Sequence, residues 1–261
     1  IALRMATIEA LKGRTIVGDN VIDSKINAVD VGADGVMRVE ADKPFIAVYT
    51  DGSSIQGDLA GRNLHKIGRT DLVIEIGITA AMTETDQTNG ESHIVGFGIP
   101  ATDGAFEFYL DLIGHQIASA LTDPENEWAE IWRALTTGLQ SIERKRVADA
   151  ESGVRMAAHQ LVYALEISAD PIRGEDLRST SALARFFALA ETVQDNDVLA
   201  ATVSAMKAAI AGTSFGWQAD LRRYGMTSVE GDAMLVTAVE GAEADIDVGE
   251  IAASPATQVQ T

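Results

Sequence analysis

The chain has 261 residues, of which 46% are hydrophobic, 23% are charged and only 5% are aromatic. Its 39 acidic and 20 basic residues give a formal net charge of −19, which excludes a generic nucleic-acid-binding domain because such a domain carries a basic surface. The absence of cysteine excludes disulfides, thiolate metal sites and cysteine nucleophiles. No apolar run approaches the roughly 20 residues that cross a bilayer, and residues 1–12 lack the apolar centre of a signal peptide. We therefore expect a soluble cytoplasmic protein with one large or two small domains.

The first 80 residues predict one helix followed by strands. Apolar residues at helical spacing predict a helix over 1–12, which Gly13 ends. Residues 14–31 predict one strand or two short ones, and Pro44 opens a strand over 45–50 that Asp51-Gly52 closes. Strict alternation predicts the most regular strand over 69–80. One face of that strand carries Leu72, Ile74, Ile76 and Ile78, and the other carries Asp71, Glu75 and Thr79.

Helices and one more strand follow a polar loop at 83–104. A helix is predicted over 105–121 with an apolar stripe of Phe106, Leu110, Ile113 and Ile117. The next helix takes Asp123 as its N-cap and Pro124 in its first turn, and runs through Leu135. Alternating apolar residues then predict a strand over 156–168, which Asp170-Pro171 ends.

The remainder of the chain predicts a helical extension. Helical patterns cover 174–192, 197–211 and 217–224, a short strand is predicted over 234–239, and the last residues, 251–261, are expected to be a disordered tail. We expect an α/β fold with a small mixed sheet flanked by helices over 1–172, and a helical extension over 173–250.

Charge is unevenly distributed along the chain. Between Arg69 and Arg133 there is no basic residue, and the acids of this stretch include Asp71, Glu75, Glu84, Asp86 and Glu91. Basic residues gather instead at Arg144, Lys145 and Arg146. These runs fit either ordinary solvated faces or a surface that repels nucleic acid or meets a charged partner.

The short motifs that resemble catalytic or phosphate-binding sequences lack the surrounding elements that those sites need. Residues 212–216 match the Gly-x-Ser-x-Gly nucleophile elbow, but the elbow needs a strand before the serine and a helical pattern precedes it here. Gly96-Phe97-Gly98 lacks the third glycine of a phosphate loop. Metal ligation is not indicated, because the four histidines, His65, His93, His115 and His159, are far apart in sequence. We expect no catalytic residues, no cofactor and no metal.

The order of elements resembles that of the tail terminator proteins of long-tailed phages. The residues that carry the resemblance are Leu3–Leu11, Lys43–Asp51, Arg69–Thr79 and His159–Ile167, followed by Asp170-Pro171. These segments are similar to the minor tail protein U family and to proteins of gene-transfer-agent-like particles. The resemblance covers residues 1–172. Family members are shorter, and residues 173–261 have no counterpart in them.

The resemblance implies a structural virion protein rather than an enzyme. Such proteins form a hexameric ring that caps the tail tube, stops its polymerisation and joins it to the head–tail connector, while DNA passes through the lumen without specific binding. Under this reading, the five acids Asp71, Glu75, Glu84, Asp86 and Glu91 face the lumen or the tube. The basic patch of Arg144, Lys145 and Arg146 faces a neighbouring subunit. Two alternatives stay open: another neck protein, such as a stopper or completion protein, and a small-molecule-binding α/β enzyme.

Overall fold

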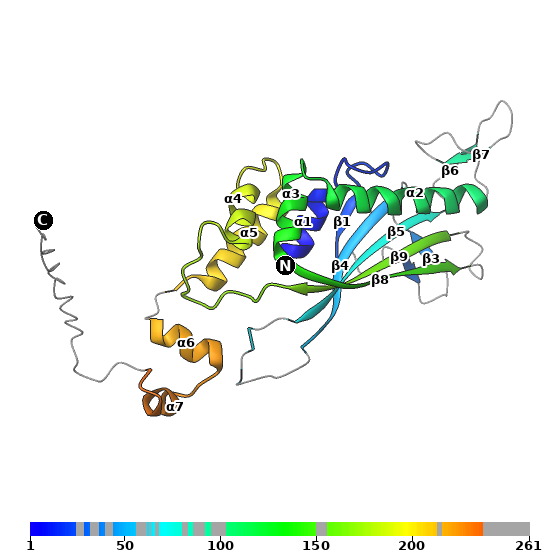
Figure 1. Cartoon of the computed structure of the whole chain (residues 1–261). Helices are drawn as coiled ribbons and strands as arrows, with labels where there is room; N and C mark the ends of the chain where they lie inside the picture. The colour runs from blue at the N-terminus through cyan, green and yellow to red at the C-terminus, as the bar shows by residue number, and fades with distance from the viewer. Residues whose placement is uncertain are drawn as a thin grey trace, which may run out of the picture.

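A computed structural model of the chain describes residues 1–24, 29–31, 37–39, 44–55, 62, 64–65, 68–79, 83–85, 92–94, 103–149, 156–212 and 216–236. Within these ranges the elements, in chain order, are α1 (Ala2–Leu11), β1 (Val21–Asp23), β2 (Val29–Val31), β3 (Met37–Val39), β4 (Phe45–Ser54), β5 (Arg69–Thr79), β6 (Thr83–Thr85), β7 (Ser92–Ile94), α2 (Asp103–Thr122), α3 (Glu127–Leu135), β8 (Thr136–Asp149), β9 (Met156–Ile167), α4 (Ala182–Ala190), α5 (Asp197–Ile210), α6 (Gly216–Tyr224) and α7 (Ser228–Ala233) (Figure 1).

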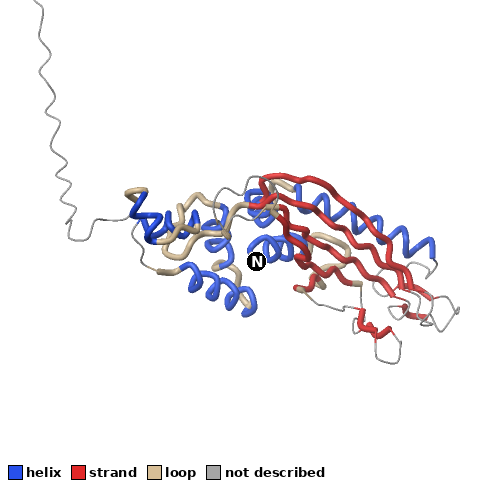
Figure 2. The backbone as a smooth tube through the Cα atoms, turned by 90° about the horizontal axis from the view of Figure 1, so that it is seen from below, coloured by secondary structure: helices blue, strands red, loops and turns tan. Residues whose placement is uncertain are grey.

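The expected α/β fold with a mixed sheet and C-terminal helices is confirmed. The main sheet has five strands in the order β1-β4-β5-β9-β8, with β1 parallel to β4 and all other neighbours antiparallel. Helices α1, α2 and α3 contact this sheet, and the strands form one layer beside them (Figures 1 and 2). The pairs β2–β3 and β6–β7 form two separate antiparallel ribbons, the second of them inside the segment predicted to be a loop.

Strand β5 has the two faces that its alternating sequence predicts. Its four alternate aliphatic residues, Leu72, Ile74, Ile76 and Ile78, are fully buried on the face that the helices cover. Asp71 and Glu75 lie on the other face and are partly exposed. The predicted end of β4 at Asp51-Gly52 is wrong: the strand continues to Ser54, and an irregular register between Thr50 and Ser53 accommodates those two residues.

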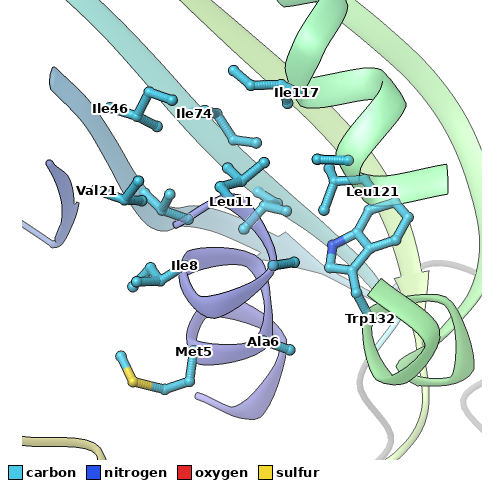
Figure 3. Close-up of a cluster of buried hydrophobic side chains, with 14 of the residues drawn as sticks. Met5, Ala6, Ile8, Leu11, Val21, Ile46, Ile74, Ile117, Leu121 and Trp132 are labelled. Carbon is cyan, nitrogen blue, oxygen red and sulfur yellow. The ribbon is translucent and has the colours of Figure 1, made fainter. Parts of the chain in front are cut away.

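Helix α1 is the centre of the hydrophobic core. Eight of its ten residues are buried, and Figure 3 shows Met5, Ala6, Ile8 and Leu11 among side chains of the sheet, α2 and α3. The predicted helix is confirmed, and Gly13 follows it with a φ of 64°, which an L side chain rarely adopts. Phe186 of α4 and Leu199 of α5 belong to the same buried cluster. The core is therefore continuous across the predicted domain boundary at residue 172, which itself stays a prediction.

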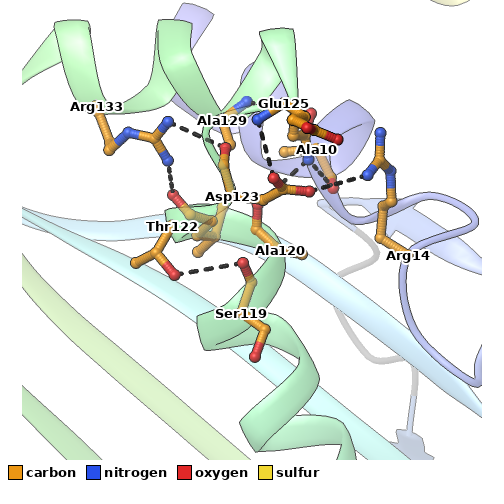
Figure 4. A network of polar contacts seen from close by, with 11 residues as sticks. Ala10, Arg14, Ser119, Ala120, Thr122, Asp123, Glu125, Ala129 and Arg133 are labelled. Atoms are coloured by element: carbon orange, nitrogen blue, oxygen red, sulfur yellow. Dashed lines mark hydrogen bonds and ion pairs between the residues drawn. The ribbon is translucent and has the colours of Figure 1, made fainter.

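The N-cap predicted for α3 is wrong. Helix α3 begins at Glu127, and Asn126 caps it by accepting a hydrogen bond from the backbone N–H of Ala129. Asp123 instead begins the tight connection from α2 to α3, where its carboxylate accepts a hydrogen bond from the backbone N–H of Glu125 at 2.9 Å (Figure 4). Because this connection turns tightly, the N-cap of α3 comes three residues after Asp123, at Asn126.

Two further predictions are corrected on the C-terminal side. The helix predicted over 174–192 is shorter, because Ser181 caps α4 and the preceding residues form turns and extended chain. The strand predicted from 234 is contradicted at its start, where Met234 and Leu235 form a turn after α7, and Leu235 has a φ of 58°. The predicted helices over 197–211 and 217–224 are confirmed as α5 and α6. The expected disordered tail, 251–261, lies outside the described residues.

Polar contacts hold α6 and α7 to the rest of the chain. Arg223 of α6 forms an ion pair with Glu175 at 2.7 Å, and Arg62 pairs with Glu230 of α7. The pKa of Glu175 is lowered, chiefly because its carboxylate accepts a hydrogen bond from the backbone N–H of Ile172. Among the described helices none has the length and apolar composition to cross a membrane.

Candidate subunit-contact surface

The face of the sheet opposite the helices carries two of the five predicted lumen acids. Glu75 accepts hydrogen bonds from the Tyr49 hydroxyl and the Gln160 amide, both at 3.3 Å, and Gln160 also donates to the Tyr49 oxygen at 3.0 Å. Burial raises the pKa of Tyr49, and the nearby Glu75 carboxylate raises it further. Glu75 is therefore tied into a cross-strand polar network rather than freely presented.

The other predicted lumen acids are less well defined. Asp71 lies on the same face as Glu75 and forms an ion pair with Arg69 at 2.9 Å. Glu84 belongs to the short strand β6, and Asp86 and Glu91 lie outside the described residues. The basic-free stretch does not form a single surface, because Glu107 and Asp111 of α2 lie on the opposite side of the sheet from Asp71. Lumen exposure of these acids stays a prediction.

The predicted basic patch lies on β8, a strand that sequence analysis missed. Because side chains alternate along a strand, Arg144 and Arg146 point to the helix side and Lys145 to the other. Arg144 forms an ion pair with Asp111 of α2, and Arg146 pairs with Glu107 one turn earlier at 2.5 Å. Lys145 lies 3.4 Å from Glu143. The three basic side chains keep half or more of their surface exposed, but they do not form one patch.

His159 lies beneath the two arginine pairs. It is 2% exposed, and its Nε2 lies 3.6 Å from the Glu107 carboxylate and 3.5 Å from the Arg144 guanidinium. Burial lowers the pKa of His159, and the charge of Arg144 lowers it further, while Glu107 and Asp111 act in the opposite direction. The arrangement links α2 to β8 and β9. Within the described ranges no cluster of three or more histidine or carboxylate side chains could hold a metal ion.

An apolar groove lies between α2, α3 and the start of β8. It has a volume of about 380 Å³. Its lining comes from four elements and includes Leu121, Trp132, Leu139, Ile142 and Tyr163. Leu121, Trp132 and Tyr163 are buried, whereas Leu139 and Ile142 are 53% and 55% exposed. The two β8 side chains thus form an apolar rim that nothing in the described part of the chain covers.

The outer edge of β8 adjoins the groove. Strand β8 ends the sheet, so one row of its backbone N–H and C=O groups has no strand partner among the described residues. Irregular register interrupts the pairing with β9 as far as Ser141, but from Ile142 onward each residue of β8 pairs regularly. The regular half therefore presents an unbroken row of backbone groups that begins at Ile142 of the apolar rim.

The remaining sequence candidates do not join a site. Gly212 follows Ala211, the C-cap residue of α5, while Ser214 and Gly96-Phe97-Gly98 lie outside the described residues. Comparison with models of known protein families and with curated proteins finds no match for this chain.

Proposed function

We propose that the chain is the subunit of a closed ring that terminates a phage-type tail tube. The proposal rests on the resemblance over residues 1–172 and on one structural observation. That observation is the 14-residue edge strand β8, with the apolar groove and exposed apolar rim beside it. An unpaired edge next to exposed aliphatic side chains is a liability in a monomer and a ready contact in an assembly.

The sheet offers the two different surfaces that a ring needs. Cyclic rings close through head-to-tail contacts in which two different surfaces of one subunit meet. Strand β8 supplies one such surface at one edge of the sheet, whereas the opposite edge, β1, has only three residues in register with β4. The two edges are therefore different surfaces, as a head-to-tail contact requires, whereas a symmetric dimer would pair β8 with β8 of a second copy.

The charge of the chain supports passage of DNA without binding. A net charge of −19 repels phosphates at a distance set by salt, on the order of 10 Å at 0.1 M ionic strength. The helix-free face of the sheet, with Asp71 and Glu75, is the surface we assign to the lumen or the tube. In this proposal the partners are the tail tube protein and the head–tail connector, and the protein is assembled in the host cytoplasm and resides in the virion neck.

The deciding experiment is the mass and shape of the purified protein. Native mass spectrometry combined with negative-stain imaging should give a six-fold ring with an open centre, alone or after addition of tail tubes. Omitting the protein during assembly should give tails of uncontrolled length. Binding to filled heads, with release of DNA when the protein is lost, would identify a stopper. A compact dimer with a deep ligand pocket would identify an enzyme. Either result refutes the proposal that the chain is a tail terminator.

The basic residues of β8 provide a mutational test of the ring contact. Changing Lys145→Glu together with Arg146→Glu should convert rings to monomers if this part of β8 faces a neighbour. The matched control is Arg178→Glu with Arg185→Glu, which changes the charge equally at exposed positions outside the sheet. Sedimentation velocity separates the two species. Persistence of rings in the first variant would show that Lys145 and Arg146 do not lie at the subunit interface.

A further inference from the structure

The groove beside β8 has room for two apolar side chains. Its volume is about 380 Å³, and a cavity of about 150 Å³ is what one missing leucine side chain leaves in a core. Leu139 and Ile142 at its rim are 53% and 55% exposed. The groove also adjoins the β8 edge, which the proposed ring uses as its contact. Its volume, apolar lining and position therefore indicate two apolar side chains from a neighbouring subunit as the occupant.

The end of α7 carries apolar side chains that the described part of the chain leaves uncovered. Val229 is 74% exposed, Met234 is 62% exposed and Leu235 is 87% exposed. Of the residues that form α7, only Gly231 is buried, and none of the described residues of α6 and α7 belongs to the hydrophobic core. A group of exposed apolar side chains on a helix without a core of its own is typical of a surface that meets a partner.

The turn after α7 holds Leu235 in a backbone conformation that glycine usually supplies. Leu235 follows the C-cap residue Met234 and has a φ of 58°. Its N–H donates to the carbonyl of Asp232 at 3.1 Å, and the N–H of Val236 donates to that of Gly231 at 2.9 Å. Glycine or asparagine is usual at this position, because a larger L side chain is strained there. A strained and exposed leucine brings the isolated subunit no benefit, which points to a role in a contact.

We propose that the end of α7 of one copy binds in the groove of a second copy. This inference rests on the proposed ring, of which it would be part of the subunit contact. Met234 and Leu235 enter the groove, and Leu235 covers the exposed side of Ile142. Both apolar surfaces are thereby removed from water. The contact joins two different surfaces of the chain, as a head-to-tail ring requires.

A second copy is the expected donor because α7 does not reach the groove of its own chain. None of the described residues of α6 and α7 lines the groove. In both views these helices lie at one end of the molecule, apart from the start of β8 (Figures 1 and 2). Helix α6 is held there by the ion pair of Arg223 with Glu175 at 2.7 Å, and by Arg222, which donates to the carbonyl of Arg173 at 3.0 Å. The groove is therefore open to α7 of a neighbour.

Replacing Leu235 by asparagine separates the contact from the fold. Asparagine adopts a positive φ readily, so Leu235→Asn should keep or raise the melting temperature of the subunit. It should nevertheless weaken subunit association about tenfold or more, because burial of a leucine side chain contributes at least that much to affinity. Leu235→Gly should act in the same way. The matched control is Val198→Asn, which removes a 66% exposed aliphatic side chain from α5 and should leave association unchanged. Sedimentation velocity over a dilution series measures the association.

The complete absence of cysteine makes a cross-linking test of the same contact specific. Two full-length variants, Leu235→Cys and Ile142→Cys, are prepared separately, mixed under mild oxidation and examined on non-reducing gels. A covalent dimer is expected, because the proposed contact brings the two side chains within disulfide reach. The control mixes Ile142→Cys with Val198→Cys, which should give no cross-link between the two variants.

The outcomes separate this inference from the proposed function. Covalent dimers in the first mixture, together with weaker association of Leu235→Asn, support the contact. An intrachain disulfide in the double variant Leu235→Cys/Ile142→Cys, with no cross-link in the mixture, shows that α7 binds its own groove and overturns the inference. Rings that form equally well with Leu235→Asn and give no cross-link also overturn it, but they leave the ring standing. Cross-links without rings support the contact and refute the ring, and the absence of both refutes the two proposals together.

Discussion

Asn126 joins three helices through one amide, and its replacement has a calculable cost. Its side-chain oxygen accepts from the backbone N–H of Ala129 at 3.4 Å, which caps α3. Its Nδ2 donates to the carbonyl of Ala10 at 2.9 Å and to that of Ala120 at 3.2 Å, in the last turns of α1 and α2. The side chain is 4% exposed, so water does not replace these bonds when they are lost.

Asn126→Ala should cost about 3 kcal/mol of folding free energy. Loss of a cap accounts for about 1 kcal/mol, and loss of each buried hydrogen bond to a carbonyl accounts for about 1 kcal/mol. The melting temperature should fall by about 6–12 °C. Ser181→Ala is the matched control, because Ser181 caps α4 through a single hydrogen bond to the Ala184 N–H and its loss should cost only about 1 kcal/mol.

Asn126→Asp separates the cap from the two donated bonds. A carboxylate caps a helix well, but here it would turn a charged oxygen towards the carbonyls of Ala10 and Ala120. It should therefore be at least as destabilising as alanine at pH 7, and less so at acidic pH, where a protonated carboxyl donates again. Urea unfolding followed by the fluorescence of Trp128 and Trp132 measures the free energies, since both lie on α3. An aspartate variant as stable as the unmodified chain at pH 7 would refute this reasoning.

Two other perturbations test the sheet and the buried histidine. Gly77→Ala should destabilise the fold by about 1–3 kcal/mol, since the new Cβ would lie 2.4 Å from the Phe45 ring; adding Phe45→Leu should recover part of the loss in the same urea assay. Because the pKa of His159 is lowered in the folded chain, the unfolded chain binds the proton more readily. This histidine therefore contributes stability that is complete above about pH 6.5 and is lost as the pH falls towards the lower pKa of the folded chain. Stability measured from pH 7.5 to 5 should therefore fall less in His159→Gln than in the unmodified chain, and identical slopes would show that the histidine titrates alike in both states. The facing groups Glu107, Asp111, Arg144 and Arg146 are kept in both proteins.

Elements buried on one face were predictable because burial leaves a period in the sequence. Strands β5 and β9 alternate, and α2 carries an apolar stripe, since each turns one face to a shared core. Strand β8 could not be found in this way. Most of its described side chains are exposed, and the bulges before Ser141 break the alternation that Leu139 and Ile142 would otherwise show. An edge strand with charged residues has no apolar face to reveal it.

The candidate surface was predictable only as separate charges. The run Arg144–Arg146 was evident, but its partners Glu107 and Asp111 are more than thirty residues away in sequence, and only the packing of α2 on β8 brings them together. The groove depends on four elements at once, so no local pattern indicates it. The capping of α3 failed for a similar reason, since Asp123 and Asn126 are both good caps and only the path out of α2 decides between them.

The position of α1 has a consequence for how the chain folds during synthesis. This helix packs against β1, β4, α2, α3 and α4, so its apolar face is covered by segments that are all made after it. The central pairing of β5 with β9 likewise waits for residues 156–167. Because such contacts are non-local, folding should be slow and should be complete only after α4 has left the ribosome. Until then the apolar face of α1 is an exposed target for chaperones, and ribosome-bound fragments that end before α4 should be digested readily by protease.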